Sequence, residues 1–375
     1  MVSIRAARPD DARLWREMRH ALWPEGKCNA RSVTHEAEVT AMDSQREMIF
    51  NRVGVRDPQV DNIEGASLLV PEGWTLTGGF YWMPTFALQV NFLAQVTDPV
   101  TGASVFMLPV QQFVWAMQQA VPMAPGTNWL GSVLYPPPRD AFEFVRLFYL
   151  PGPLQHLAHA RVVQVEDLPK YAEAVWRTLG DRRGVRVTRL RHAYEWGGRA
   201  WEEDVYVTLV CDPPGAITMW WGEGYAMRAP AGELDRMRPI LSVPVRSVRF
   251  SLDWEATRDY VRDLFRKNVN DTIIRTAQWG HLVRQYREEL SQAHRQVWAE
   301  RQAAQDRQSF ALREVLGGIE TFKNPFDSHT VEVPAGYQQQ WVNPQGQVIL
   351  SNNPMYDPRP GSNVDWRNME RYKPG

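Results

Sequence analysis

The sequence predicts an α+β protein: a body built on a mixed or antiparallel sheet, then a long C-terminal helix and a small hairpin tail. Residues 46–250 are rich in Val, Trp, Tyr, Phe and Pro, in short runs between turn signals that are typical of strands. Residues 251–316 are charged, Gln-rich and almost free of Gly and Pro, which favours helix. Because strands and helices fall in separate blocks, the pattern favours α+β over βαβ repetition.

Composition divides the chain into four segments. They are an N-terminal fragment at 1–45, the α+β body at 46–250, a long amphipathic helix at 251–316 and a Pro/Gly/Asn-rich hairpin tail at 317–375. The first segment predicts a strand, then a helix capped by Asp10. That helix has an apolar stripe at Leu14, Trp15, Met18 and Leu22.

The sequence of the body predicts several strands and one helix, which precede a hairpin in the chain. The hairpin is the most clearly predicted element. The strands are expected at 67–70, 75–82, 88–95 and 103–109, and the helix at 168–179. The hairpin joins 185–196 to 199–210 through Gly197-Gly198, where both glycines can take positive φ. Its register places Tyr194 opposite Trp201, His192 opposite Glu203 and Arg191 opposite Asp204, and each of these cross-strand pairs is favourable. A third strand at 217–227 and a helix at 232–241 should complete this layer.

The long helix and the tail are predicted from caps, periodicity and turn residues. Asp253 is the expected N-cap, with Glu255 in the first turn. An a/d-like stripe follows, which either packs on the chain's own sheet or forms a homodimer seam; it comprises Trp279, Val283, Tyr286, Leu290, Ala293 and Val297. The tail predicts a hairpin of 338–342 and 347–351 around Pro344. We expect it to dock on the body or on a partner through Tyr337, Trp341, Tyr356 and Trp366.

Composition and charge narrow the class of protein. The 375 residues are 44% hydrophobic and 23% charged, with a net charge of −1, so disorder and bulk electrostatic binding of nucleic acid are disfavoured. Two cysteines exclude a disulfide-rich scaffold. No apolar run reaches 18 residues and no signal-peptide core is present, so we expect a soluble cytoplasmic protein without a membrane span.

Residues 1–40 resemble the start of a GNAT-type acetyltransferase, most like the aminoglycoside 6′-N-acetyltransferases. The matching pieces are Ile4-Arg5-Ala6-Ala7, Pro9-Asp10-Asp11, Trp15, Ala21-Leu22-Trp23-Pro24 and His35-Glu36-Ala37-Glu38-Val39. The resemblance implies a first strand and helices that help to wall the acceptor site. The family's Arg/Gln-x-x-Gly-x-Gly/Ala loop, which holds the acetyl-CoA pyrophosphate, is not found in this sequence.

Residues 48–375 resemble a family of uncharacterised bacterial proteins. The motifs are Arg52-Val53-Gly54-Val55-x-Asp57-Pro58, Val70-Pro71-x-Gly73-Trp74, Tyr225-x-x-Arg228-Ala229-Pro230 and the ending Gly336-Tyr337 … Trp341-x-Asn343-x-x-Gly346 … Asn353-Pro354-x-Tyr356-x-Pro358. This family has no assigned activity to transfer. A PsbP-like α/β sandwich is the fold analogy that it suggests.

Candidate chemical groups are few. His156 and His159 are spaced i, i+3 without a Cys or carboxylate nearby, which favours surface or packing roles over a metal site. Cys211 is expected to be half-buried at a strand end. An acidic cluster on the hairpin either binds a cation or, as we favour, forms a solvated cross-strand charge face; it comprises Glu195, Glu202, Glu203 and Asp204. We expect no catalytic residue, metal or cofactor.

The main site hypothesis is a ligand groove formed by Trp220, Trp221, Glu223 and Tyr225. Glu223 lies between Gly222 and Gly224, and glycine inside a strand marks either a bulge or the close approach of a ligand. A bulge packed by aromatic residues is the alternative interpretation. The expected function is therefore non-enzymatic binding of a partner protein or a small ligand by a bacterial protein. Alternatives are a GNAT-type acetyltransferase acting on an amine and a hydrolase with scattered residues.

Overall fold

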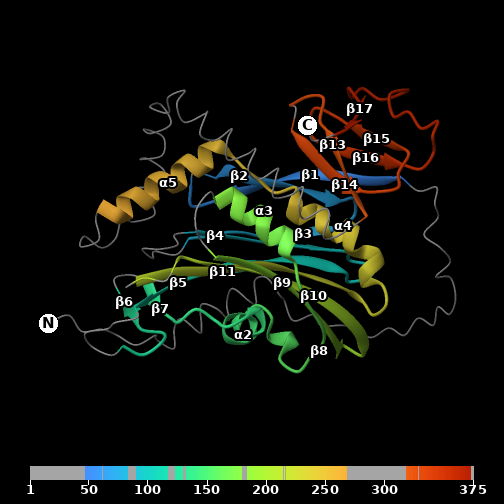
Figure 1. The fold of residues 1–375 in the computed structure, drawn as a ribbon. Coiled ribbons are helices and arrows are strands. Elements are labelled where there is room, and N and C mark those ends of the chain that lie inside the picture. Colours follow the sequence, from blue (N-terminus) through green and yellow to red (C-terminus); the bar gives the residue numbers. More distant parts are fainter. Residues whose placement is uncertain are drawn as a thin grey trace.

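The computed structural model describes residues 47–60, 62–82, 90–116, 123–129, 132–179, 184–213, 215, 217–267, 318–327 and 329–372. These residues form a β-rich α+β fold with mostly antiparallel sheets and four short α-helices (Figure 1). The acetyltransferase-like segment with Asp10 and the apolar stripe from Trp279 to Val297 lie outside the described residues. None of the described helices has the length and apolar character needed to cross a membrane.

The largest layer is a nine-stranded sheet. Its main path runs β3-β4-β5-β11-β10-β9-β8, with β6 and β7 attached beside β5. All of its pairings are antiparallel except that of β5 with β7. The strands are β3 (Thr75–Trp82), β4 (Val90–Thr97), β5 (Ser104–Ala116), β6 (Asn128–Trp129), β7 (Ser132–Leu134), β8 (Arg161–Asp167), β9 (Gly184–Trp196), β10 (Arg199–Cys211) and β11 (Ile217–Pro230).

A six-stranded sheet joins the beginning of the body to the tail. Its order is β12-β2-β1-β16-β15-β17, so β1 pairs with a strand of the tail hairpin. A three-stranded sheet, in the order β14-β13-β18, lies beside it. The strands are β1 (Met48–Asp57), β2 (Ile63–Pro71), β12 (Arg249–Phe250), β13 (Ile319–Lys323), β14 (Thr330–Pro334), β15 (Gln339–Val342), β16 (Val348–Ser351), β17 (Arg367–Asn368) and β18 (Glu370–Arg371).

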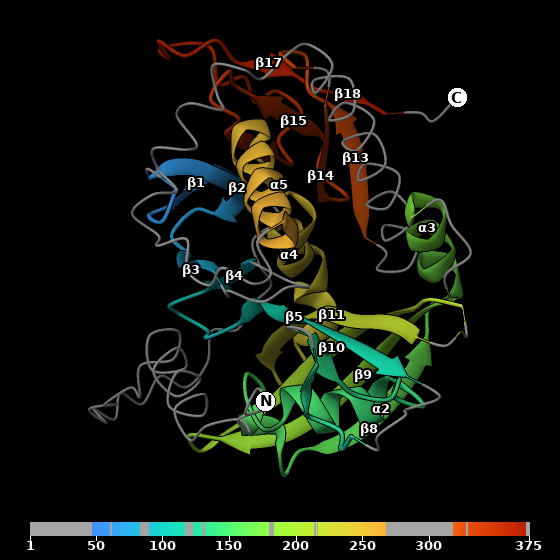
Figure 2. The same ribbon diagram turned by 90° about the vertical axis from the view of Figure 1, so that its left-hand side faces the viewer.

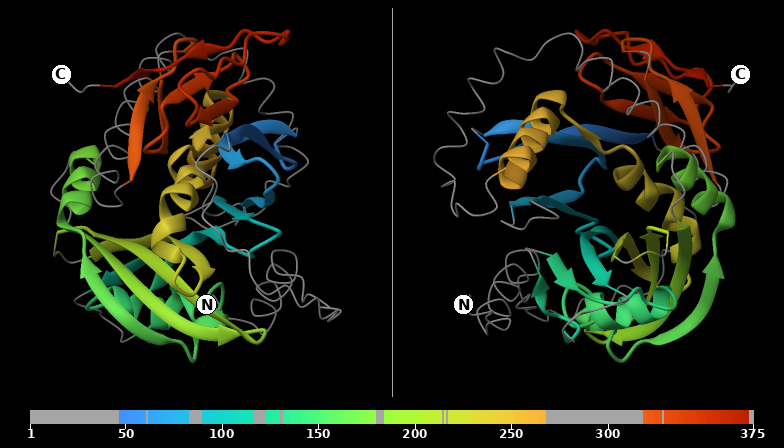
Figure 3. Two further views of the ribbon diagram at one scale, coloured as in Figure 1. Left: turned by 90° about the vertical axis from the view of Figure 1, so that its right-hand side faces the viewer. Right: turned by 60° about the vertical axis from the view of Figure 1, so that its left-hand side comes forward.

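Helical segments cover both faces of the nine-stranded sheet. On one face lie α3 (Pro169–Leu179) and α4 (Leu234–Arg246); on the other lies α2 (Ala141–Phe144) with the short helical turns η1 (Val145–Tyr149) and η2 (Gln155–Leu157) (Figure 3). Asp140 begins α2 by accepting a hydrogen bond from the Glu143 backbone N–H at 2.8 Å. Because α4 contacts β11, β2 and β14, it lies between the layers.

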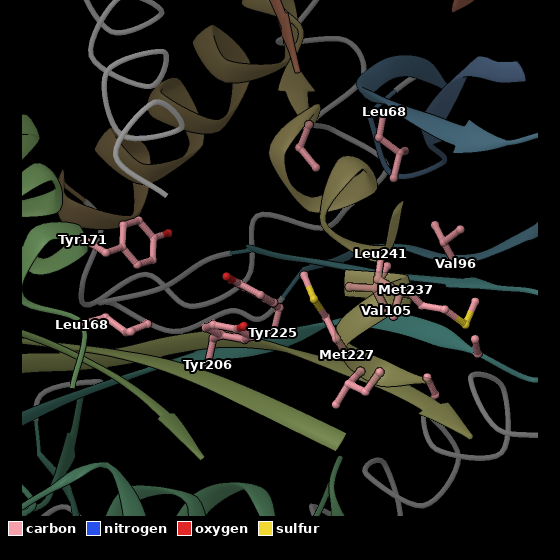
Figure 4. Close-up of a cluster of buried hydrophobic side chains, with 14 of the residues drawn as sticks. Leu68, Val96, Val105, Leu168, Tyr171, Tyr206, Tyr225, Met227, Met237 and Leu241 are labelled. Carbon is pink, nitrogen blue, oxygen red and sulfur yellow. The ribbon is translucent and has the colours of Figure 1, made fainter. Parts of the chain in front are cut away.

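The hydrophobic core is divided accordingly. One cluster fills the space between the nine-stranded sheet, α3, α4 and β2 (Figure 4). A second lies under the opposite face, against α2, η1 and η2. A third joins α4, β1 and β2 to the tail strands. The tail therefore shares a core with the body, and Tyr337, Trp341, Tyr356 and Trp366 all pack in this region, as the aromatic pattern predicts.

The predicted hairpin is confirmed together with its register. In the β9–β10 pair Tyr194 is opposite Trp201, His192 is opposite Glu203 and Arg191 is opposite Asp204. Gly197 and Gly198 have φ of 62° and 73°, the positive values that a two-residue turn of this type requires. The third strand is β11, the covering helix is α4, and the predicted tail hairpin is β15–β16.

The cap predicted for the long helix is wrong. The helix α5 (Leu252–Lys267) begins one residue before Asp253, and Ser251 accepts a hydrogen bond from the Trp254 backbone N–H at 3.1 Å. Ser251 is a cap residue of equal quality, and it positions α5 beside β2 (Figure 2). No long C-terminal helix is evident in the described part of the chain, since α5 has 16 residues and residues 268–317 are not described.

Candidate functional site

The acidic cluster of the hairpin is not a solvated charge face, because both central carboxylates are buried. Asp204 is 0% exposed and Glu203 is 2% exposed. Neighbouring residues of a strand point to opposite faces, and each face of β10 is covered by another layer. The cross-strand register was sufficient to pair these residues but not to show that α4 and η2 would bury them.

Asp204 is held by arginines on the α4 side of the sheet. Arg191 donates to both of its oxygens, from Nε at 2.8 Å and from an Nη at 3.1 Å, and Arg238 of α4 donates at 3.0 Å. Arg189 lies 3.9 Å from the same carboxylate. Arg191 and Arg238 also pair with the exposed Asp235. These charge-assisted bonds attach α4 to the sheet and leave Asp204 fully paired.

Glu203 faces the opposite layer and is paired there. Its Oε2 lies 2.8 Å from His156 Nε2 of η2 and accepts a hydrogen bond from the Tyr194 hydroxyl at 2.7 Å. Burial alone would raise the pKa of Glu203, but the charge and hydrogen bond of His156 outweigh it and lower that pKa to about 2. Arg228, opposite Glu203 in the ladder, lies over Trp201 with its guanidinium carbon 4.8 Å from the ring centroid.

This pairing also locates the two histidines that the spacing singled out. His156 belongs to the Glu203 cluster, whereas His159 is exposed. Among the residues that the structure describes, no group of three His, Cys, Asp or Glu side chains could hold a metal ion. Cys211 is half-buried at the end of β10, as predicted, and burial raises the pKa of its thiol.

A bulge lies at the glycine-flanked Glu223. The β11–β5 register shifts between Gly222 and Gly224, so that Pro109 and Val110 of β5 stand opposite the single residue Glu223. The alternation of side chains with β10 is unbroken there, with Glu223 opposite Thr208. A bulge, the alternative interpretation of the two glycines, is therefore present, and its extra residue lies on β5.

Both glycines are required by close contacts. A Cβ on Gly222 would lie 2.2 Å from the Phe144 ring, and a Cβ on Gly224 would lie 2.2 Å from the Tyr206 carbonyl oxygen. Such distances are far inside van der Waals contact, so larger residues do not fit. Aromatic packing explains Gly222, and the approach of β10 explains Gly224.

The two tryptophans of the predicted groove do not lie together. Trp220 is fully buried against Phe113, with ring centroids 4.5 Å apart, and its Nε1 donates to the Tyr135 carbonyl at 2.7 Å. Trp221 is half-buried and, by the alternation of the strand, faces the side of Glu223 and Tyr225. Trp220 is therefore separated from the other three residues by the sheet itself.

Tyr225 belongs to a cluster of tyrosines that the sequence did not indicate. Its ring stacks on that of Tyr206, with centroids 4.7 Å apart and planes at 18°. Tyr171 of α3 faces it from across the core, and their hydroxyls point toward one another in Figure 4. Burial, followed by the influence of Tyr171 and Tyr206, raises the pKa of Tyr225 well above its usual value.

The Tyr225 hydroxyl has no hydrogen-bond partner among the described residues, although Tyr225 is only 6% exposed. Buried polar groups are almost always paired, because an unpaired one costs about 1–3 kcal/mol. This hydroxyl points into the space between the sheet and α3. It is one of the two polar groups on which the candidate site depends.

The second polar group on which the candidate site depends is the carboxyl group of Glu223. In the described part of the chain it makes no hydrogen bond or ion pair, and desolvation raises its pKa. The residue as a whole is half-buried, and the surrounding protein desolvates its carboxyl group. It also lies close enough to Tyr149 to raise the pKa of that phenol, after burial, and the Tyr149 hydroxyl donates to the Pro109 carbonyl at the bulge.

Comparisons with known proteins identify no family. No family and no curated protein matches the chain. Among solved structures, one match is the solution structure of cyanobacterial PsbP (CyanoP) from Synechocystis sp. PCC 6803. It has 9% sequence identity, covers 61% of this chain and 99% of that chain, and has a TM-score of 0.16. At that TM-score the match carries no argument, so the PsbP-like analogy stays a prediction.

Proposed function

We propose that this protein binds a small ligand through Glu223 and Tyr225 of β11, beside the bulge in β5, and that its role is binding and not catalysis. The observation that carries the proposal concerns two polar groups, two residues apart on one strand: both are buried or desolvated, and neither has a partner among the described residues. A ligand that supplied those partners would recover free energy that the unliganded fold lacks.

The local backbone supports a site at this position. Bulges occur frequently next to binding and active sites, since they redirect a side chain and end regular pairing. Here Glu223 lies opposite Thr208, between the cross-strand pairs Val210–Trp221 and Tyr206–Tyr225. A mostly apolar surface with a few polar groups is typical of small-molecule sites.

The contrast with the other buried carboxylates supports a binding role for Glu223 in particular. Asp204 has arginine partners, Glu203 has His156 and Tyr194, and Glu332 pairs with Arg246. Each of those groups is explained by the packing of layers against one another. Within the part of the chain that the structure describes, Glu223 has no such partner, and we propose that a ligand supplies one.

Other parts of the sequence-based function are carried forward as proposals. They are a cytoplasmic location, a protein partner in place of a small ligand, and a homodimer through the stripe from Trp279 to Val297. The acetyltransferase alternative depends on residues 1–40, which lie outside the described residues. The site at β11 is the part of the functional hypothesis that the described residues support.

A fragment screen by ligand-observed NMR tests the proposal. The library contains amines, carboxylates, amides and neutral aromatics, and each hit is measured again on Glu223→Gln and on Tyr225→Phe. We expect hits whose affinity falls at least tenfold in one or both variants. Tyr372→Phe and Glu202→Gln are matched controls outside the site, where affinity should be unchanged. If no fragment binds, or if every hit binds both site variants as well as the parent, the site is not at β11.

A further inference from the structure

The strand β8 has an outer edge that no described strand covers. We infer that two copies of this protein pair through β8, antiparallel about a two-fold axis at Gln164, so that their nine-stranded sheets join into one continuous sheet. This inference is independent of the ligand site proposed at β11. It follows from the exposure of β8, from its bulge and from the charges at its two ends.

The exposure of β8 is the first observation. The strand ends the main path of the nine-stranded sheet, where it pairs with β9 and with no other described strand (Figure 1). Six of its seven residues are exposed, among them Val163 at 44% and Val165 at 60%. An open edge is a template for pairing with another chain, and exposed valines favour it further. A partner strand on β8 would therefore cover both backbone groups and apolar side chains.

Other edges of the described sheets do not combine these properties. At the opposite end of the same sheet, β3 has no exposed apolar side chain and contains two glycines with positive φ. The strands β6, β12, β17 and β18 have two residues each, and three of the five residues of β14 are buried. Within the described part of the chain, β8 is therefore the edge best suited to receive a strand.

The bulge in β8 determines which of its side chains share a face. Gln164 stands opposite position 191 of β9, while Arg161 and Glu166 stand opposite positions 193 and 189. Positions 189 and 193 are four apart on a regular strand, so their side chains lie on one face. Because the bulge inserts one residue before Gln164, Arg161 and Glu166 also share a face. Each of them is two ladder steps from Gln164, in opposite directions.

The charges at the two ends are complementary in a two-fold pair. An axis at Gln164 brings Arg161 of each copy opposite Glu166 of the other copy, because both are two steps from the axis. Opposite charges directly across two strands are favourable, and like charges are not. A parallel pair would instead place Arg161 opposite Arg161 and Glu166 opposite Glu166. The charges therefore select the antiparallel arrangement.

Both charged groups are accessible to a second copy. Arg161 is exposed and makes no ion pair with a described residue. The Glu166 side chain is 45% exposed and binds Arg189 of its own chain through Oε2 at 2.5 Å. A carboxylate can accept from two donors, so Oε1 can accept from Arg161 of the second copy. Asp167 follows Glu166 and adds negative charge to the same end of the strand.

The centre of the seam is apolar. Val163 and Val165 flank Gln164 and, by the alternation of the strand, lie on one face. The two-fold pair places Val165 of one copy beside Val163 of the other, which removes both from water. The Gln164 side chains meet at the axis, where each amide can donate and accept. A seam of one strand pair is small, so we expect a weak dimer and not an obligate one.

Sedimentation equilibrium of the full chain between about 5 and 500 μM measures the association. We expect the parent to dimerise with a dissociation constant of about 100 μM or tighter. Val165→Lys should raise that constant at least tenfold, because it puts a charge at the apolar centre of the seam. Val100→Lys is the matched control: Val100 is 86% exposed in a turn away from β8, and its variant should stay within twofold of the parent. Circular dichroism confirms that the variants are folded.

An exchange of charges makes the test specific to this register. Arg161→Glu alone opposes Glu to Glu at both ends, and Glu166→Arg alone opposes Arg to Arg, so each variant by itself should dimerise at least tenfold more weakly. An equimolar mixture of the two variants restores opposite charges at both ends. The mixture should form a heterodimer with a dissociation constant within threefold of that of the parent. Arg177→Glu on the exposed side of α3 is the control and should have no effect.

A cysteine at the axis locates the seam. Directly opposite residues of antiparallel strands have Cα atoms about 4.5–5.5 Å apart, which a disulfide can bridge. Gln164→Cys should therefore give a disulfide-linked dimer on mild oxidation. Val100→Cys should give no more of it than the parent, which has two cysteines of its own.

Three results would overturn the inference. The first is a parent that stays monomeric at 500 μM. The second is a dimer whose dissociation constant is unchanged by Val165→Lys and by both charge variants, which would mean that the copies meet through another surface. The third is a mixture of the charge variants that associates no better than either variant alone. The fragment screen decides the proposed ligand site separately.

Discussion

The Asp57 carboxylate accepts a hydrogen bond from the Trp254 indole N–H at 2.7 Å, and the two residues are 197 positions apart. The same oxygen accepts from Trp82 Nε1 at 2.8 Å, so β1, β3 and α5 meet at one buried carboxylate. The Trp254 ring also stacks on Phe250 and packs on Phe80, with ring centroids 5.4 and 4.4 Å away. This contact is the main described attachment of α5 to the sheets.

Asp57→Ala should destabilise the protein by about 2–4 kcal/mol, because it removes the acceptor of the buried Trp254 indole N–H and that of the half-buried Trp82. Trp254→Phe keeps the aromatic contact and removes one donor, so its cost should be smaller, about 1.5–3 kcal/mol. Urea unfolding followed by circular dichroism measures both. Trp176→Phe on the exposed face of α3 is the control. A loss under 1 kcal/mol for Asp57→Ala would show that water or another group satisfies the indoles.

Gly197→Val and Gly198→Val should each cost about 1–2 kcal/mol or more, because β-branched residues are disfavoured at positive φ. No atom lies within 4 Å of the Cβ position at either glycine, so the cost is conformational and not steric. Gly184→Val at the start of β9 is a matched control, since that glycine has an ordinary φ and a Cβ there would make only a normal van der Waals contact, with the Cys211 carbonyl oxygen at 3.9 Å. Thermal unfolding compares the three variants. Equal losses of stability in all three variants would mean that the positive φ of the turn is not the cause of the destabilisation.

Glu203 should make the fold sensitive to acid. A carboxyl group whose pKa is depressed in the folded state stabilises it above the unfolded pKa, and that stability is lost as pH falls toward the folded pKa. For Glu203 the window runs from about pH 4.5 down to about 2, and the full contribution is about 3 kcal/mol. Urea midpoints between pH 7 and 2.5 should fall less steeply for Glu203→Gln than for the parent. The parallel variant Glu202→Gln should keep the parental slope, and an unchanged slope in Glu203→Gln would refute the assignment.

Tyr225→Phe should leave stability unchanged or raise it by about 1 kcal/mol, because the hydroxyl that it removes has no partner. Tyr149→Phe is the matched control: that phenol is also buried, but its hydroxyl donates to the Pro109 carbonyl at 3.0 Å. The control should lose about 1 kcal/mol. Chemical unfolding without added ligand compares the two. A clear loss of stability in Tyr225→Phe would mean that its hydroxyl is satisfied within the fold.

Glu223→Gln should gain stability over the parent as pH rises. A carboxyl group with a raised folded pKa destabilises the fold progressively between its unfolded and folded pKa values, and the penalty is constant above the latter. The variant has no such penalty, so its urea midpoint should exceed that of the parent more at pH 8 than at pH 4. If the difference in urea midpoint between variant and parent is no larger at pH 8 than at pH 4, the prediction is contradicted.

Sequence reasoning succeeded where the deciding interactions are local. Gly197-Gly198 and the pairs on either side determine the β9–β10 register without reference to the rest of the fold. The two glycines around Glu223 left a bulge and the approach of a ligand as alternatives; the register shows a bulge, whereas the contact of Gly222 with Phe144 of α2 had no local signal. These predictions needed only alternation, turn geometry and residue type.

Sequence reasoning failed where a segment distant in the sequence determines the environment of a residue. Nothing in the sequence around Asp204 shows that Arg238 of α4 binds it, and nothing near Glu203 indicates His156. The burial of both carboxylates therefore had no local signal. Ser251 and Asp253 are both good cap residues for α5. The fold around the helix, and not the local sequence, determines that Ser251 is the cap.

The pairing of β1 with β16 has a consequence for the order of events during synthesis. Phe50 must find Val348, which the ribosome adds about 300 residues later. At 5–20 residues per second, the β1–β2 hairpin waits roughly 15–60 s for its second neighbour. Throughout that time β1 has an open edge, which is a template for pairing with other nascent chains. We therefore expect this chain to depend on holding chaperones while it is made, and to refold slowly from denaturant because so long a loop must close.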